Sequence, residues 1–569
     1  MPIAFSRCDH IPSSEIAACH LAIKDGESDF DPRASTFKMR RPCDEALVRT
    51  GTPDSPCADK SRPWVLAATI VGSSMAFIDS TVVNVALPAL QSSLHADIVG
   101  VQWVIESYGL FLSALILVGG ALGDAFGRRA MFLSGIAGFA IASAGCGLSS
   151  SITELVIWRC VQGVAAAFLV PGSLAIISAS FEEEHRGRAI GTWSGFTAIT
   201  TALGPVLGGW LVEHASWHWV FFINVPLAVF VMAITVRHVP ESRSSTPKRI
   251  DWLGAAIATA GLMGLVYGFL ESAFLGWKHP QVFGSVLAGL VLMALFLFVE
   301  MRVAAPMVPL ELFKSPSFGA ANLLTLFLYA GLGIFFFLYP LNLIQVQNYS
   351  ATATGAAALP IILLMFSLSR WSGGLVAHYG AQLPLTVGPV IVALGFLLCA
   401  LPSGKANYWV TFFPAFIVLG LGMAISVAPL TTVVMNSVDE DRAGTASGIN
   451  NAVARVAGVL AVAVLGAVMV ASFSYSLKGS LASLRLDPVV THDVESNAAK
   501  LAGLDPPANQ DPKTKEEIRF VVRDAFIFGF RTVMLISAVL ALASAVTAWR
   551  MIPARGAQEE REFRHAPAT

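Results

Sequence analysis

Three charged residues, Asp79, Arg159 and Glu106, lie inside long apolar segments of the sequence. A charge at the centre of a bilayer costs about 2.5–3.5 kcal/mol on insertion scales, so such a residue usually faces a cavity or a charged partner. The proton affinity of a buried carboxylate depends on its access to water and on its distance from a neighbouring cation. We therefore interpret these residues as candidates for binding and releasing a proton. The alternatives are a static ion pair for Asp79 and Arg159, and a Glu106 side chain that reaches the membrane surface.

Helix geometry predicts that Asp79 and Arg159 lie in the same half of the membrane. At about 1.5 Å per residue, Asp79 lies about 16 Å and Arg159 about 9 Å from the predicted outer ends of their segments, so an ion pair is sterically possible. Thr81 and Asn84 follow Asp79 and can form hydrogen bonds within a helix bundle. Pro88 ends or bends the same segment, and a bent helix leaves room for a cavity. We expect Thr81 and Asn84 to line that cavity.

The composition is that of a membrane protein. Of 569 residues, 55% are hydrophobic and 13% are charged, whereas charged residues make up about 25% of a soluble protein. A helix needs roughly 20 apolar residues to cross the hydrocarbon core. The segments that approach this length predict an all-α integral membrane protein with fourteen spans, at 65–90, 101–122, 131–149, 153–180, 189–212, 217–236, 251–271, 280–300, 317–345, 354–377, 383–402, 408–436, 444–472 and 526–550.

The charges between these segments predict the orientation of the chain. Alternate loops carry most of the arginines and lysines, and the intervening short loops carry only Lys278 and Lys405. Because positive charge marks cytoplasmic loops, we expect both termini in the cytoplasm and 473–525 as a long extracellular loop. Within that loop, 516–523 is a candidate amphipathic helix on the surface. We expect the tail 1–63 to be disordered and cytoplasmic, and the tail 551–569 to be cytoplasmic.

Composition and motifs also argue against several classes of function. The net charge is −1 and no basic stripe is present, which argues against a nucleic-acid partner. The seven cysteines include no close pair suited to metal or redox chemistry, so we expect no metal site. No nucleophile stands beside a base and no nucleotide-binding loop occurs, so a membrane-embedded enzyme or sensor is a disfavoured alternative.

A short polar loop between the second and third segments combines Gly120, Asp124, Gly127, Arg128 and Arg129. The glycines allow a tight turn, and the arginine pair can be solvated at the cytoplasmic surface. A plain positive-inside turn explains the arginines but not the spacing of Asp124 and the two glycines. We therefore interpret the loop as a cytoplasmic gate.

Small residues follow one side of the fifth segment, at Gly191, Gly204, Pro205, Gly208 and Gly209. A face of small residues lets helices approach closely. Such a face suits a tight seal between two moving bundles, and ordinary helix packing is the alternative.

Two parts of the chain repeat each other. The stretch 171–178 and its acidic-then-basic loop are echoed by 429–436 and a similar loop. The repeat predicts two six-helix bundles, at 64–237 and 317–550, with a helix pair at 250–300 inserted between them. Chance similarity between apolar segments is the alternative.

Taken together, these residues resemble the fourteen-helix drug:proton antiporter family of the major facilitator superfamily, over nearly all of 64–550. The stretch 79–88 matches the motif of that family's first helix most closely, and the polar loop matches the signature between the second and third helices. Arg159 and Gln162 match the motif of the fourth helix. Gly204 and Pro205 match the motif typical of antiporters.

The resemblance carries further expectations and two departures. It implies that Asp124 accepts the positive end of the helix that begins near Gly444. It also implies that Gln162 lies in the cavity. Ala125 stands where the family usually has arginine, and Thr200 replaces a motif glycine, which puts close packing at that point in doubt.

The function implied by the resemblance is proton-driven export of small amphipathic compounds by alternating access. Asp79, together with Glu106, would take up a proton and loosen from Arg159. We expect a monomer in the cell membrane, with protons, a small-molecule substrate and membrane lipid as its partners and no cofactor. A dedicated exporter of one metabolite, siderophore or lipid is the alternative.

Overall fold

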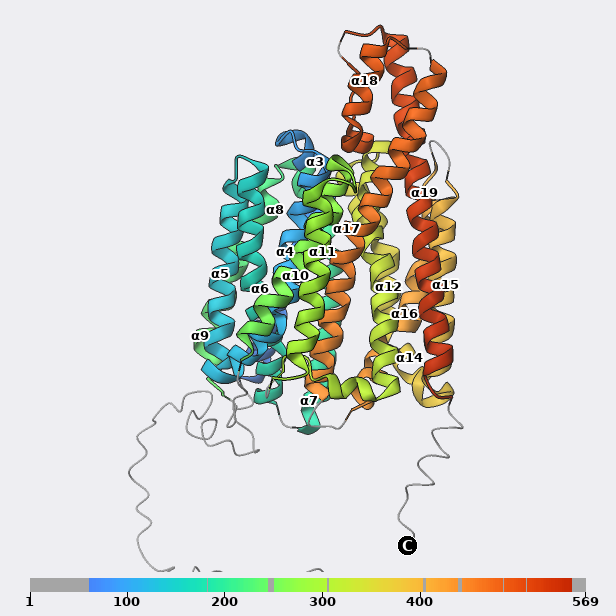
Figure 1. Ribbon diagram of the computed structural model, residues 1–569. Helices are drawn as coiled ribbons and strands as arrows, with labels where there is room; N and C mark the ends of the chain where they lie inside the picture. Colours follow the sequence, from blue (N-terminus) through green and yellow to red (C-terminus); the bar gives the residue numbers. More distant parts are fainter. Residues whose placement is uncertain are drawn as a thin grey trace, which may run out of the picture. The chain divides into compact units, whose positions relative to one another are not determined.

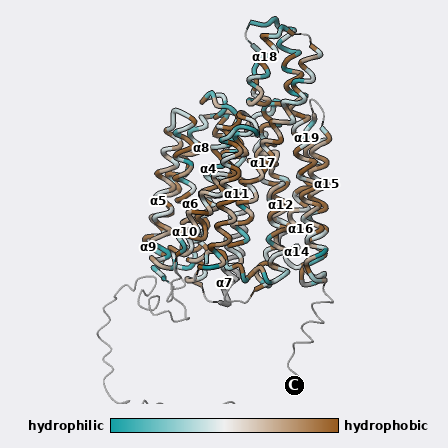
Figure 2. The backbone as a smooth tube through the Cα atoms, viewed as in Figure 1, coloured by the Kyte–Doolittle hydropathy of each residue, from teal (hydrophilic) through white to brown (hydrophobic). Residues whose placement is uncertain are grey.

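The computed structural model describes residues 61–181, 183–243, 250–303, 306–402, 406–438, 443–484, 486–507 and 509–554, and over these residues the chain forms helices and no strand. The predictions for 1–60 and 555–569 lie outside the described residues. Figure 2 shows apolar residues along most of the helices, with hydrophilic residues concentrated toward the ends.

The first group of helices follows the predicted segments closely. It comprises α3 (Arg62–Ser93), α4 (Ile98–Phe126), α5 (Arg128–Leu148), α6 (Ile152–Ser180), α7 (Glu183–His214), α8 (His218–Phe222) and α9 (Asn224–His238). The side chains of Asp97 and Ser151 cap α4 and α6 by accepting hydrogen bonds from backbone N–H groups of the first turn. Helix α6 packs against both α4 and α5, and α3 packs against α7.

The predicted inserted pair consists of α10 (Trp252–Leu275) and α11 (Pro280–Glu300), which pack against each other. Helix α10 also contacts α4 and α17 (Ala443–Leu484), so it lies beside helices from both ends of the chain (Figure 1). Only 17% of the most apolar stretch of α11 is buried inside the protein, as suits a helix that faces lipid.

The second group begins with the short η1 (Leu310–Lys314) and α12 (Pro316–Leu341), which continues into η2 (Asn342–Val346). It goes on with α13 (Ala351–Ala357), α14 (Leu359–Tyr379), α15 (Gln382–Ala400), α16 (Phe412–Asn436), α17, α18 (Pro488–Ser496), η4 (Ala498–Gly503) and α19 (Pro512–Met551). The ring of Phe335 on α12 lies 6.0 Å from that of Phe396 and 5.6 Å from that of Phe416. These aromatic contacts join α12 to α15 and α16.

The segment 473–525 differs from the expected loop. Helices α17 and α19 run on beyond their apolar parts and, with α18, form a projection at one end of the bundle (Figure 1). Residues 516–523, the candidate amphipathic helix, are helical, but they lie in the first turns of α19 and do not form a helix of their own. Asp511 caps this helix, and Ile518, Val521 and Val522 are buried, so the apolar stripe of the span continues into the projection.

Among the described residues, thirteen helices are long and apolar enough to cross a membrane. They coincide with all of the predicted spans except 189–212. That span lies within α7, a helix of 32 residues whose glycines and threonines make it less apolar than the others. The chain is therefore a multi-pass membrane protein, and the count of fourteen spans is approximate.

Candidate functional site

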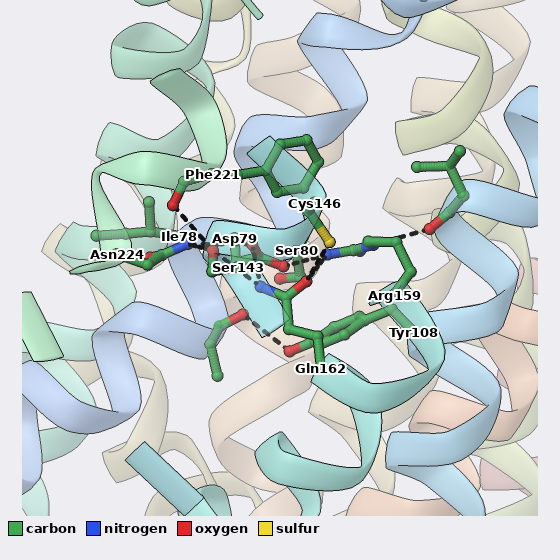
Figure 3. Close-up of polar contacts among 12 residues, drawn as sticks. Ile78, Asp79, Ser80, Tyr108, Ser143, Cys146, Arg159, Gln162, Phe221 and Asn224 are labelled. Carbon is green, nitrogen blue, oxygen red and sulfur yellow. Dashed lines mark hydrogen bonds and ion pairs between the residues drawn. The ribbon is translucent and has the colours of Figure 1, made fainter. Parts of the chain in front are cut away.

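Asp79 on α3 and Arg159 on α6 form an ion pair inside the protein (Figure 3). The guanidinium Nη1 lies 2.5 Å from the carboxylate Oδ2, and the two side chains are 1% and 0% exposed. Arg159 also donates from Nε to the carbonyl of Val104 at 2.9 Å and from Nη1 to the Gln162 side chain at 2.7 Å. Asp79 and Arg159 therefore form the ion pair that helix geometry allowed.

The second oxygen of Asp79 is bound from two other side chains. Gln162 donates to Oδ1 at 2.9 Å, and Asn224 at the start of α9 donates to it at 3.2 Å. Ser143 on α5 accepts from both amides, at 3.3 Å from Gln162 and 2.9 Å from Asn224. The carboxylate is thus held by side chains of three types from α6 and α9, and Ser143 of α5 binds the two amides. Buried charges need such compensation.

Sequence reasoning missed Asn224 and Ser143. Asn224 is a polar residue in an otherwise apolar stretch, which was a usable signal. Ser143 gave none, because serine is common in membrane helices and bonds to its own backbone as readily as to a partner.

An aromatic side chain covers the ion pair from α4. The Tyr108 ring centroid lies 4.3 Å from the guanidinium carbon of Arg159, and the Tyr108 hydroxyl donates to the carbonyl of Ala76 at 3.3 Å. The ring of Phe221 lies 5.9 Å from the same carbon. The cation therefore has aromatic faces beside it, which favour it electrostatically.

Glu106 is buried but does not belong to this network. Its side chain is 1% exposed, so the alternative that it reaches the surface is wrong. Neither carboxylate oxygen has a hydrogen-bond partner among the described residues. Neighbouring positions on α4, Gln102 and Gly109, contact Gly466 and Val459 of α17, which indicates that this side of α4 faces α17.

Thr81 and Asn84 mostly bind their own helix. Thr81 donates to the carbonyl of Ile78 at 3.0 Å and lies 3.4 Å from the carbonyl of Thr201 on α7. Asn84 donates to the carbonyl of Ser80 at 3.3 Å. Neither side chain joins the Asp79 network, and their assignment to a transport cavity stays a prediction.

A pocket of about 480 Å³ lies beside the inserted pair, within the volume range of about 300–1,000 Å³ that small-molecule sites have. It is lined from α4, α10, α11, α12 and α17 by mostly apolar side chains, including Leu117, Leu262, Phe296, Leu323 and Val453. Its lining does not include Thr81, Asn84 or Gln162.

The predicted polar loop is shorter than expected, because Gly120 and Asp124 lie in the last turns of α4 and Arg128 and Arg129 begin α5. The chain turns at Gly127 alone, whose φ is +117°. A Cβ atom at this position would lie 2.6 Å from a carboxylate oxygen of Glu241. That carboxylate accepts hydrogen bonds from the backbone N–H groups of Arg129 and Ala130, each at 3.1 Å. Glu241 therefore caps α5, a contact that sequence reasoning missed because the two residues are far apart in the chain.

The remaining loop residues have local roles in this state. Arg128 pairs with Asp124 at 2.9 Å, and Arg129 donates to the carbonyl of Val236 at 2.8 Å. A Cβ atom at Gly120 would meet only Pro171, at 3.7 Å. Residues 439–442, before α17, lie outside the described residues, so the contact of Asp124 with that helix stays a prediction.

We expect Gly127→Ala to destabilise the protein by about 1–3 kcal/mol, because alanine is strained at this φ and its methyl group meets Glu241. Gly123→Ala is the matched control, since its added Cβ would have no contact closer than 4.0 Å. Melting temperatures of the two purified variants measure the difference. Equal melting temperatures would contradict the role given to Gly127.

The small residues of α7 do bring helices close together. A Cβ atom at Gly204 would lie 2.0 Å from the Thr81 hydroxyl, and one at Gly208 would lie 2.4 Å from the Val82 side chain of α3. One at Gly209 would lie 2.3 Å from the carbonyl of Ala351 on α13. Gly191 also lies in α7.

Two further contacts complete the environment of this helix. The carbonyl of Pro205 faces α13, where a Cβ atom at Gly355 would meet it at 2.0 Å. Thr200, which replaces the motif glycine, donates to the Ser74 hydroxyl of α3 at 2.9 Å. A hydrogen bond therefore joins the two helices where the motif would have a glycine.

The helices that cross the membrane and the buried ion pair between them are those of a polytopic membrane protein. Comparison with known proteins identifies its family. The model of the Major Facilitator Superfamily matches residues 69–462. The chain therefore belongs to the major facilitator superfamily, a family of membrane transporters rather than enzymes.

Several relatives match along most of their length. The chain is 31% identical to the tetracenomycin C resistance and export protein of Streptomyces glaucescens, over 86% of this chain and 91% of that one. It is 32% identical to multidrug resistance protein Stp of Mycobacterium tuberculosis (strain CDC 1551 / Oshkosh), over 87% and 93%. It is 30% identical to the methylenomycin A resistance protein of Bacillus subtilis (strain 168), over 71% and 87%.

Solved structures agree on the fold. A bacterial homologue of the human lysosomal transporter Spinster, in an inward-facing conformation, matches with a TM-score of 0.58 at 15% identity, over 86% of this chain and 98% of that one. A D-xylose–proton symporter matches with a TM-score of 0.54 at 13% identity, over 86% and 98%. At these identities the likeness concerns the fold alone.

Proposed function

We propose that the protein exports small amphipathic compounds in exchange for protons. The names of the relatives support export of toxic compounds, since they describe resistance to tetracenomycin C, to several drugs and to methylenomycin A. The observation that carries proton coupling is the buried carboxylate of Asp79, held by Arg159 at 2.5 Å. Ionisable residues inside membrane segments are costly, and in transporters they commonly bind protons.

We further propose that the helices form two lobes, 64–237 and 317–550, with the pair at 250–300 beside them and both termini in the cytoplasm. In support, α7 contacts α13 and α14, and α4 contacts α17, so the two groups of helices meet along a limited set of elements. Near the projection, Gln345 donates to the Gln91 side chain at 2.9 Å. Glu213 accepts from the backbone N–H of Thr352 at 3.2 Å. In this state the lobes touch at the proposed outer end.

The transport cycle begins when the lobes separate at the outer end and water reaches Asp79. Protonation neutralises the carboxylate, so the attraction between α3 and α6 through Arg159 weakens. Gln162 and Asn224 still donate hydrogen bonds to Oδ1 of the neutral group. Substrate then leaves and the lobes tilt, which opens the site to the cytoplasm. Asp79 releases its proton on that side, and the ion pair of Asp79 with Arg159 forms again. Glu106 is a candidate for a second proton, at a separate place on α4.

The energy available is sufficient for useful export. A membrane potential of 100 mV supplies about 2.3 kcal/mol per charge, and one pH unit supplies about 1.4 kcal/mol. Together they support a gradient of about a few hundredfold for a neutral compound exchanged against one proton. A monovalent cation exchanged one for one would draw only on the pH difference.

The test is transport by the purified protein in lipid vesicles. An imposed pH gradient is expected to drive accumulation of fluorescent dyes, and a protonophore is expected to abolish it. Transport that ignores the pH gradient would overturn proton coupling. A panel of unrelated dyes and biocides separates a broad exporter from a dedicated one, because a carrier for one metabolite, siderophore or lipid should ignore most of them.

A further inference from the structure

A second arginine, Arg455, lies in the apolar part of α17. Its side chain is partly buried, yet no ion pair or hydrogen bond of its guanidinium is found among the residues that the structure describes. This differs from Arg159, whose guanidinium is bound by a carboxylate, an amide and a carbonyl. An uncompensated cation in the membrane is costly, so Arg455 calls for a partner.

The neighbours of Arg455 belong to the other group of helices. Its guanidinium carbon lies 5.9 Å from the ring centroid of Phe77 on α3. Phe77 lies two residues before Asp79 on the same helix, so the position is close to the ion-pair network in the chain. Arg455 therefore extends from α17 toward α3 of the first lobe.

The charges around this position leave a positive excess. Asp79 and Arg159 cancel each other in their ion pair. Glu106 on α4 is a second buried carboxylate. It lies one turn from Gln102 and Gly109, which contact Gly466 and Val459 of α17. Val459 and Gly466 are four and eleven residues beyond Arg455, or about 6 and 16 Å along the helix. The guanidinium of Arg455 is thus free to bind an anion from outside the chain.

We propose that Arg455 binds the anionic group of the transported compound, and that aromatic carboxylates or phenolates are therefore among the substrates. This inference rests on the proposed export function. A guanidinium binds a carboxylate through two parallel hydrogen bonds, and the partly exposed ring of Phe77 offers an apolar face to an aromatic body. The site joins both lobes, because the cation comes from α17 and the aromatic face comes from α3.

The first experiment measures binding without any gradient, using purified protein in detergent and two fluorescent probes. One probe is the anionic dye carboxyfluorescein and the other is the cationic dye ethidium. We expect Arg455→Gln to weaken binding of the anionic dye about tenfold or more, the usual effect of losing a hydrogen bond to a charged group. Ethidium binding should stay within about twofold, and Arg455→Lys should lie between the two, because lysine keeps the charge but not the paired hydrogen bonds.

The control is Lys478→Gln, which removes a cation from the exposed part of the same helix, where its side chain is 63% exposed. Melting temperatures establish that each variant is folded. Equal losses for both dyes would give Arg455 a packing role, and unchanged binding of the anionic dye would remove it from the site. Either result overturns the inference. The Arg455 variants could weaken binding of the anionic dye alone while transport by the unsubstituted protein ignores a pH gradient. That combination would overturn proton coupling and leave the inference about Arg455 standing.

A second experiment uses the charge carried through the membrane. Export of an anion against one proton moves at least two charges in the same electrical sense, and more for a multiply charged dye such as carboxyfluorescein, so a membrane potential drives it strongly. In vesicles with a potassium diffusion potential and no pH gradient, we expect transport of the anionic dye to respond to voltage and transport of ethidium to be indifferent. Voltage-independent transport of the anionic dye would contradict its passage as an anion.

Discussion

Asp79→Asn is expected to abolish accumulation of substrate against a pH gradient while exchange of labelled for unlabelled substrate continues. Asparagine keeps the shape and can still accept from Gln162 and Asn224, but it cannot gain or lose the proton. The measurement is dye transport in reconstituted vesicles after a pH jump, compared with counterflow at equal pH on both sides. An Asp79→Asn variant that still concentrated dye in response to the gradient would refute the assignment of the proton site.

The design must allow for the loss of the ion pair. Removing one partner of a buried pair destabilises a protein by about 3–5 kcal/mol, because the other charge stays uncompensated. The double variant Asp79→Asn with Arg159→Gln removes both charges, so we expect it to recover much of the lost melting temperature. It should still fail to couple transport to protons. A double variant with restored coupling would show that the pair serves only stability.

Gly355→Ala is expected to slow transport strongly by forcing α7 and α13 apart. The added Cβ would lie 2.0 Å from the carbonyl oxygen of Pro205 and 2.9 Å from the backbone nitrogen of Val206. Backbone atoms cannot move aside as the end of a flexible side chain does. Overpacking costs about 1–3 kcal/mol, which corresponds to roughly a fivefold to 150-fold loss of the state in which these helices touch.

Gly374→Ala is the matched control for this prediction, because no atom lies within 4 Å of its added Cβ. Both substitutions replace a helical glycine by alanine, so helix propensity changes alike. Labelling of Gln345→Cys with a membrane-impermeant maleimide reports whether the proposed outer end opens. We expect faster labelling and slower transport with Gly355→Ala and neither effect with Gly374→Ala. Unchanged labelling would exclude the α7–α13 contact as part of the outer seal.

The sequence alone predicted the approximate bounds of most spans, because apolarity and length are local properties of the chain. It also located Asp79 and Arg159, since an isolated charge in an apolar segment is visible without a structure. The same signal was present at Arg455, which stands in the predicted span 444–472. The close approach at Gly204 and Gly208 also followed from composition, because only small residues permit it.

The tertiary structure decided which of these residues meet. Asn224 and Ser143 join Asp79 because α9 and α5 pack beside α3 and α6, and their rotation about the helix axes turns these side chains inward. Glu106 and Tyr108 are two residues apart on α4, yet one faces α17 and the other covers Arg159. Each residue advances about 100° around the helix axis, so these two side chains point to nearly opposite sides of α4. Which neighbour each side meets depends on how α4 is rotated in the bundle, and the sequence does not specify that rotation. Contacts between distant segments depend on packing, and packing is a property of the folded chain as a whole.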